Sequence, residues 1–183
     1  MGFALKTTDL PHYTYDDYTH WEGRWELIKG IPYSMSPLPS LKHQDINGKI
    51  YYQLFDEVAK CKQCKVFMPI EWKIDKDTIV QPDISIICKK IDDSAYATQI
   101  DFPPTLIFEI LSPSNKHKDL ITKFELYQSE KVNYYILIHP DTEKAEVYEY
   151  QNNQYHKVKE THHESVTFEL EKCKVKFDFN TIW

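Results

Sequence analysis

The chain has 183 residues, enough for one domain with a sizeable hydrophobic core, and we expect a single domain over residues 1–183. Hydrophobic residues make up 42% of the sequence and charged residues 27%, which is ordinary for a globular protein. The net charge of −6 argues against a strongly basic nucleic-acid-binding protein, although it leaves room for a local basic patch.

Neither the first residues nor any later run indicates a membrane protein. Met1–Lys6 contains no apolar signal core, and no run is long and apolar enough to span a bilayer. We therefore expect a cytoplasmic protein with reduced cysteines and no membrane partner. Cys61 and Cys64 have the spacing of a zinc or redox pair, but Cys88 and Cys173 do not form a second such pair. The spacing therefore argues against a structural zinc.

Local signals predict two helices and a hairpin in the first third of the chain. Thr14 and Asp17 have the spacing of a capping box, which favours a short helix over Tyr15–Trp21. The turn Lys29-Gly30 separates two strands, which we expect at Trp25–Ile28 and Ile31–Met35. A helix from about Leu41 to Lys60 is predicted by apolar residues at every fourth position, namely Ile46, Ile50, Leu54 and Val58.

Alternating apolar residues and turn signals predict the remaining elements. We expect a helix over roughly Lys118–Ser129 and a polar surface loop over Lys89–Phe102. The predicted strands are Val66–Ile74, Val80–Cys88, Leu106–Leu111, Asn133–Ile138, Ala145–Tyr150, Gln154–Lys159 and Ser165–Leu170, before an apolar tail over Val175–Trp183. This order predicts an α/β (α+β) fold with a mixed β-sheet flanked by helices and additional N-terminal and C-terminal strands.

One apolar strand contains a charged residue. Within Pro104–Ser112, Leu106 and its alternate neighbours share one face of the predicted strand, while Glu109 shares the other face with Ile107 and Leu111. Both faces are otherwise apolar, so the strand is predicted to be central and covered on both sides. A buried, unpaired carboxylate costs several kcal/mol or more, so Glu109 requires a metal ion, a basic side chain or a proton as its partner.

Asp83 is a second acid in an apolar segment. The preceding Pro82 cannot donate a ladder hydrogen bond and favours a sheet edge, a bulge or a local parting of strands; parting would open space beside Asp83. Asp83 and Glu109 could then meet around one Mg²⁺ (or Mn²⁺) ion, since hard cations prefer oxygen ligands. The alternative is that each acid pairs with a lysine or lies at an exposed strand end; the two acids together favour a site.

The helix after Glu109 offers a possible basic partner. Asp119, Lys123 and Tyr127 are spaced by four residues and share one helix face, where Lys123 could stabilise developing phosphate charge. From spacing alone, a surface Asp119–Lys123 pair with Tyr127 in the core is the simpler interpretation. Glu26 could be a further acid of the site, although a solvated strand residue is the simpler reading. His43 could face the site or water.

Several of these motifs together resemble the Uma-type restriction endonucleases, a branch of the PD-(D/E)xK nuclease superfamily. The resemblance extends in order from about Tyr13 to Tyr155. Its most specific part is the run Glu109-Ile110-Leu111-Ser112-Pro113-Ser114, followed by Asp119, Lys123 and Tyr127 at the family's spacing. Its other segments are Trp25–Gly30, Pro39–Gln44, Pro82–Ser85 and Tyr134–Leu137 with Pro140.

The resemblance implies a restriction-endonuclease-like fold and magnesium-dependent hydrolysis of DNA. It makes Asp83 and Glu109 the metal ligands and Glu26 a further acid of the site. The superfamily's usual lysine stands two residues after the second acid, where this chain has Leu111; the resemblance makes Lys123 its replacement.

Three functional interpretations follow. The first is an endonuclease in which Asp83, Glu109, Lys123 and Glu26 are catalytic. The second is a binding module that keeps the nuclease fold without efficient cleavage, which the acidic net charge and Leu111 favour. The third adds self-association, because the chain has many aromatic residues and DNA-cleaving enzymes often need two active sites; we expect a homodimer.

Overall fold

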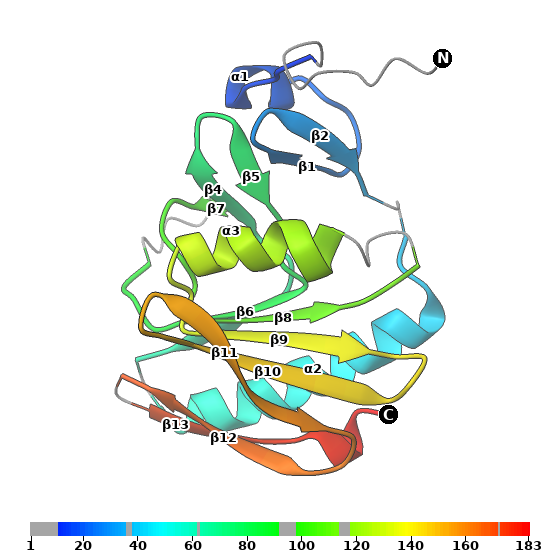
Figure 1. Cartoon of the computed structure of the whole chain (residues 1–183), viewed down its shortest axis with the longest axis vertical. Helices are drawn as coiled ribbons and strands as arrows, with labels where there is room; N and C mark the ends of the chain where they lie inside the picture. Colours follow the sequence, from blue (N-terminus) through cyan, green and yellow to red (C-terminus); the bar gives the residue numbers. More distant parts are fainter. Residues whose placement is uncertain (1–10, 36–37, 62, 92–97, 114–117, 172) are drawn as a thin grey trace.

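The computed structural model describes residues 11–35, 38–61, 63–91, 98–113, 118–171 and 173–183. In these ranges the chain forms a mixed α+β fold with a six-stranded sheet at its centre (Figure 1). Its strands are, in spatial order, β11 (Gln154–Thr161), β10 (Lys144–Gln151), β9 (Tyr134–His139), β8 (Leu106–Ile110), β6 (Ile84–Ile87) and β3 (Lys65–Phe67). Strands β8 and β9 are parallel and the other neighbours are antiparallel, so the predicted mixed sheet is confirmed.

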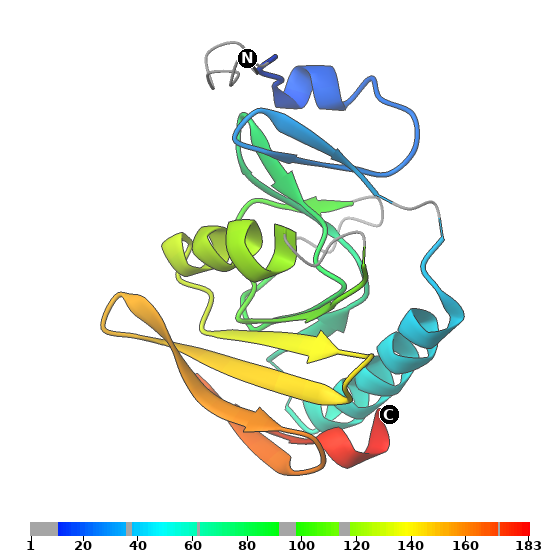
Figure 2. The ribbon, with the colours of Figure 1, turned by 45° about the vertical axis from the view of Figure 1, so that its right-hand side comes forward.

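A smaller, five-stranded sheet lies at the N-terminal end of the molecule (Figures 1 and 2). Its strands are, in spatial order, β2 (Ile31–Ser34), β1 (Trp25–Ile28), β5 (Thr78–Val80), β4 (Glu71–Asp75) and β7 (Gln99–Ile100). The predicted hairpin turn is confirmed: Lys29 and Gly30 both have positive φ, as two-residue hairpin turns require. The predicted capping box also forms, at the start of a helix shorter than expected, α1 (Tyr15–Tyr18).

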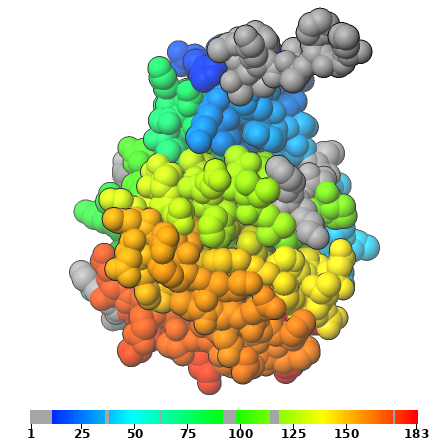
Figure 3. Space-filling view, in the orientation of Figure 1, coloured from blue at the N-terminus to red at the C-terminus, as the bar shows by residue number. Residues whose placement is uncertain are grey.

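Two helical segments cover opposite faces of the central sheet. Helix α2 (Leu41–Ala59) places its predicted apolar stripe against one face, together with the strand pair β12 (Ser165–Leu170) and β13 (Cys173–Asp178), before the short 3-10 helix η3 (Phe179–Thr181). On the other face lies a helix whose first part, η2 (Lys118–Lys123), is π-helical and whose second part is α3 (Phe124–Ser129). In Figure 3 the residues of this helix lie between the surfaces of β1–β2 and β10–β11.

Strand β8 separates the two hydrophobic cores. Leu106, Phe108 and Ile110 pack with α2 and β12–β13, while Ile107 and Leu111 pack with Tyr127 and Tyr135 beneath α3. Every residue of β8 is buried, which confirms the central, doubly covered strand predicted from its alternation. Glu109 therefore points to the face that carries η2 and α3.

Two strands predicted as continuous are each divided by proline. Val66–Ile74 splits around Pro69 into β3 and β4, and Val80–Cys88 splits around Pro82 into β5 and β6. In both cases the two parts belong to different sheets, because a residue without an N–H group interrupts the ladder where the chain crosses over. The loop expected over Lys89–Phe102 also contains the short strand β7.

The structure pairs all four cysteines as disulfides, Cys61 with Cys173 and Cys64 with Cys88. The expectation of reduced thiols is therefore wrong for this state of the chain. Within the described ranges, no helix combines the length and the apolar character that crossing a membrane requires.

Candidate active site

A cavity of about 650 Å³ opens where the two large sheets meet the N-terminal end of α2. Three of the acids and bases singled out from the sequence line it: Asp83, Glu109 and Lys123. The other lining residues are Arg24, Ser34, Met35, Leu38, Pro39, Ser40, His43, Asn47, Pro69, Gln81, Ser112, Pro113 and Lys118. Segments that are distant in the sequence thus line the same cavity.

The strand pair β6–β8 brings Asp83 and Glu109 together. Ile84 pairs with Phe108 in an antiparallel register, so Asp83, one residue earlier, lies opposite Glu109. Oδ2 of Asp83 accepts a hydrogen bond from the backbone N–H of Ile110 at 2.8 Å and lies 3.2 Å from Nε2 of His43. The chain parts at Pro82, one of the outcomes that its missing N–H group allows, and Asp83 is held against β8.

His43 reaches Asp83 from the first turn of α2. The hydroxyl of Ser40 caps this helix by accepting the N–H of His43 at 3.2 Å, which fixes where the imidazole points. Burial by itself would lower the pKa of His43, but the hydrogen bond and charge of Asp83 outweigh it and raise the pKa. His43 therefore faces the site rather than water.

Glu109 is 1% exposed and has two donors on the same oxygen. Oε1 accepts from Nζ of Lys123 at 2.8 Å and from the hydroxyl of Tyr127 at 2.9 Å. Burial nevertheless raises the pKa of Glu109 well above its usual range, because the charge of Lys123 is opposed by neighbouring acids such as Asp119. Lys123 and Tyr127 hold the carboxyl in place, but they do not offset the cost of burying its charged form.

Lys123 is the centre of the charge cluster. Its Nζ lies 2.8 Å from Oε1 of Glu26, 2.8 Å from Oε1 of Glu109 and 3.4 Å from Oδ1 of Asp119. Burial alone would lower the pKa of Lys123, but Glu109 and Glu26 hold it well above the usual value. The amine is a permanent cation here, and the interpretation of a surface Asp119–Lys123 pair is wrong.

Glu26 is fully buried, so its interpretation as a solvated strand residue is also wrong. Oε1 accepts from the backbone N–H of Gln81 at 2.8 Å and from Lys123, and Oε2 pairs with Lys118. Burial alone would raise the pKa of Glu26, but Lys123 and Lys118 lower it. Glu26 is therefore ionised and holds both ammonium groups in place, but it does not itself line the cavity.

Asp119 is the least satisfied acid of the cluster. It is 0% exposed, and within the described part of the chain neither carboxyl oxygen has a hydrogen-bond donor. Burial raises the pKa of Asp119 to about 6. The π-helical turn η2 directs this side chain and Lys123 inward; such turns occur often at functional sites.

The donor set of this cluster suits a hard divalent cation. Four carboxyls face two lysines: Glu26, Asp83, Glu109 and Asp119 against Lys118 and Lys123. All the anionic donors are oxygens, which Mg²⁺ and Mn²⁺ prefer. A cation beside Asp83 and Glu109 would offset the excess negative charge.

Sequence reasoning missed Gln81 and Lys118 as parts of this network. The run Lys116-His117-Lys118 is visibly basic, but such clusters at the start of a helix are mostly solvated. Lys118 is instead paired with Glu26, a partner 92 residues away in the sequence. Lys116 and His117 lie outside the described residues.

Comparisons with known proteins agree with this fold. No curated protein matches the chain. The solved structure of a "putative nuclease belonging to DUF820" from Anabaena variabilis superposes with a TM-score of 0.73 at 18% identity, over 93% of this chain and 97% of that chain. This likeness confirms the fold. A model of the Uma2 family, described as "Putative restriction endonuclease", matches residues 14–177. Because that match covers most of the sequence, the chain belongs to the Uma2 family.

Proposed function

We propose that the protein is a metal-dependent endonuclease that hydrolyses DNA phosphodiester bonds in this cavity. The observation that carries the proposal is the juxtaposition of Asp83 and Glu109 across β6–β8, with Nζ of Lys123 2.8 Å from Oε1 of Glu109. Membership of a family of restriction endonucleases supports it.

Asp83 and Glu109 are the residues that would hold Mg²⁺ or Mn²⁺. A divalent ion supplies Lewis acidity toward a phosphoryl oxygen and lowers the pKa of a bound water. Hydrogen bonds already orient both proposed ligands: the Ile110 N–H and His43 hold Asp83, and Tyr127 holds Glu109. A preorganised carboxylate pair loses little entropy when the ion binds.

Lys123 is proposed to stabilise the charge of the pentacovalent phosphate. Because Glu109 and Glu26 keep its pKa well above the usual value, its amine donates hydrogen bonds and does not accept a proton from water. It takes the place of the lysine that the superfamily usually has at the position of Leu111. Leu111 itself packs in the core with Tyr127.

Glu26 is proposed as a positioning residue rather than a ligand. Both of its oxygens are engaged by Lys118, Lys123 and the Gln81 N–H, so it fixes the two ammonium groups instead of binding water or a second ion. Lys118 and Arg24 line the cavity and are the cations that would contact the DNA backbone.

The test is plasmid cleavage with Mg²⁺ or Mn²⁺ by wild type, Asp83→Asn and Glu109→Gln. We expect wild type to nick plasmid and both variants to lose at least about 100-fold in rate, the scale of losing one electrostatic contribution at a reacting centre. Glu169→Gln, an exposed acid of β12, is the matched control and should cleave normally. Equal nicking by Asp83→Asn would identify a contaminating nuclease, and no nicking by wild type would contradict the proposal.

The second candidate is a binding module that keeps the nuclease fold without cleaving DNA. The burial of Glu109 and its existing hydrogen bonds favour this candidate. This acid is 1% exposed and already bonded to Lys123 and Tyr127. Calorimetric titration with Mn²⁺ separates the two candidates. Binding to wild type that is lost in Asp83→Asn supports the enzyme, whereas no binding to wild type supports the module.

Homodimerisation stays a prediction. The outer side of α2 exposes three large apolar side chains, Leu41, Tyr52 and Phe55, which a second copy could cover. Sedimentation velocity tests this directly. A monomer at high concentration would contradict the prediction.

A further inference from the structure

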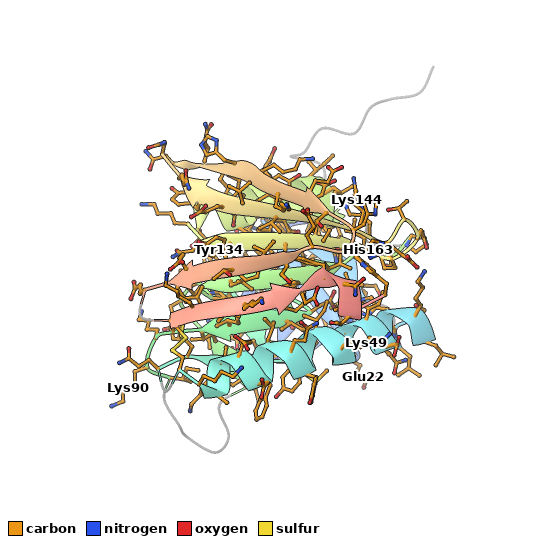
Figure 4. The ribbon with its side chains drawn as sticks, turned by 90° about the horizontal axis from the view of Figure 1, so that it is seen from below. Glu22, Lys49, Lys90, Tyr134, Lys144 and His163 are labelled. Atoms are coloured by element: carbon orange, nitrogen blue, oxygen red, sulfur yellow. A yellow bond between two sulfur atoms is a disulfide. The ribbon has the colours of Figure 1, made fainter. Side chains whose placement is uncertain are left out.

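All four cysteines of the chain meet at one place, remote from the cavity in the fold. Cys61 and Cys64 follow the C-terminal end of α2, Cys88 directly follows β6, and Cys173 begins β13. Figure 4 shows the C-terminal end of α2 and the start of β13 at the same side of the molecule. Cys64 and Cys173 are buried, and the other two are half-buried.

The sulfurs are closer than two independent disulfides require. The structure joins Cys61 to Cys173 and Cys64 to Cys88, with Cα–Cα distances of 5.8 and 4.0 Å. The Sγ atoms of Cys61, Cys64 and Cys173 nevertheless all lie within 4.8 Å of one another, although Cys64 belongs to the other pair. The two pairs are therefore in contact: the sulfurs of Cys61, Cys64 and Cys173 form one group, and Cys88 is joined to that group through its bond to Cys64. A tetrahedral Zn(Cys)₄ centre with Zn–S of about 2.3 Å requires sulfurs roughly 3.8 Å apart.

We propose that in the reduced chain these four cysteines hold one structural Zn²⁺. Cys61 and Cys64 form the C-x₂-C half of such a site, with the N–H of Cys64 turned back to the carbonyl of Cys61 at 3.5 Å. Cys88 and Cys173 complete it from two strands. Zinc displaces one proton from each of the four thiols and leaves a centre of charge −2.

Four cysteine ligands leave no open coordination position, so the zinc is structural rather than catalytic. It connects elements that also build the proposed active site. Helix α2 carries His43 in its first turn and Cys61 after its last, while β6 lies between Asp83 and Cys88. A metal centre at the far ends of α2 and β6 would fix their relative position, and with it the positions of His43 and of Asp83, which directly precedes β6.

The experiment measures metal in protein purified under reducing conditions from cells supplied with zinc. We expect about one zinc per chain, four thiols that react with a chromogenic disulfide reagent only after denaturation, and zinc release by an organomercurial. Replacement by Co²⁺ should give the thiolate-to-cobalt charge-transfer and intense ligand-field bands of a tetrahedral sulfur site. Reduced wild type that contains no zinc and has four freely reactive thiols would overturn the proposal. So would metal-free protein whose intact mass is four hydrogens below that of the reduced chain.

Two variants separate this site from the proposed nuclease metal. Asp83→Asn should keep its zinc and its cobalt spectrum, because it alters only the cavity. Cys88→Ser should lose zinc or bind it more weakly with altered cobalt bands. If Cys88→Ser does not fold, removal of zinc from wild type by a chelator provides the readout: the melting temperature should fall and recover when Zn²⁺ is returned. Zinc lost from Asp83→Asn but retained by Cys88→Ser would overturn the proposal.

Discussion

Two clusters of charged side chains in this molecule are balanced in opposite ways. In the cavity cluster, four carboxyls (Glu26, Asp83, Glu109 and Asp119) face Lys118 and Lys123. In the edge cluster, on β9–β11, the single buried carboxylate of Glu146 lies 2.7 Å from Lys144, 3.7 Å from Lys157 and 3.5 Å from His139, with Glu160 further out.

The pKa values reflect this difference. Burial raises the pKa of Asp119 to about 6. Burial acts on Glu146 too, but hydrogen bonds from Lys144 and Tyr148 outweigh it and lower its pKa to about 2. An acid that stabilises the fold is thus surrounded by donors, whereas the cavity keeps more negative charge than its lysines neutralise. Such an excess is costly for folding and suits a site that binds a cation.

Removing the central cation should have the largest effect. Lys123→Met leaves Glu26, Glu109 and Asp119 buried without their shared partner, and we expect the free energy of unfolding at pH 7 to fall by about 3–5 kcal/mol. Urea denaturation followed by circular dichroism measures it. Adding Glu109→Gln to Lys123→Met should recover part of the loss, because it removes a buried acid that has lost its cationic partner. A loss below about 1 kcal/mol would mean that the cavity acids are not charged in the folded state.

Glu146→Gln should cause the next largest loss in the free energy of unfolding, and this loss should depend on pH. The folded pKa of Glu146, about 2, lies below its ordinary value of 4.5, so its contribution to stability is present above pH 4.5 and is lost as the pH falls toward 2. This difference corresponds to about 3 kcal/mol at most, and solvent near the half-exposed Lys157 reduces it to about 1–2 kcal/mol at pH 7.

Urea midpoints of wild type and Glu146→Gln between pH 7 and pH 2.5 test this expectation. The two curves should converge on the acidic side. Glu160→Gln, at a more exposed position of the same cluster, is the matched control and should change stability less. A pH-independent difference between wild type and Glu146→Gln would show that packing, not charge, is responsible.

The strongly periodic parts of the fold could be predicted from the sequence. The apolar stripe of α2 and the alternation of β8 each depend on one dominant interaction, burial of a regular face, which a short window of sequence contains. The parting of the chain at Pro82 was also predictable, since it follows from one missing N–H group. The break at Pro69 rests on the same chemistry, but the apolar residues on both sides concealed it.

The buried network could not be derived from spacing because its partners are distant in the chain. The alternation of β1 predicts that Glu26 is exposed to solvent. Its burial is possible because Lys118 and Lys123 of η2 form ion pairs with its carboxylate. The expectation of reduced thiols failed for the same reason. Cys88 and Cys173 have no local pairing signal, and the contact of β6 and β13 with the end of α2 assembles them. The local pattern singled out Asp83 and Glu109, and the resemblance to a family added Glu26 and Lys123 to the same site.

Asp119→Asn should give the smallest change in the free energy of unfolding. This change should be a gain in stability, whereas Glu146→Gln should cause a loss. The folded pKa of Asp119, about 6, lies above the ordinary aspartate value of 3.8, so its stabilising form is the protonated one. Wild-type stability from this group is fully present below pH 3.8 and is lost as the pH rises through about 6. Asparagine cannot ionise, so the variant should be more stable than wild type by about 1 kcal/mol at pH 8, after allowing for the lost attraction to Lys123. Urea midpoints at pH 8 and pH 4 should show that advantage disappearing in acid. Destabilisation at both values would place Asp119 with Glu146 as a structural charge, and the contrast between the two clusters would no longer hold.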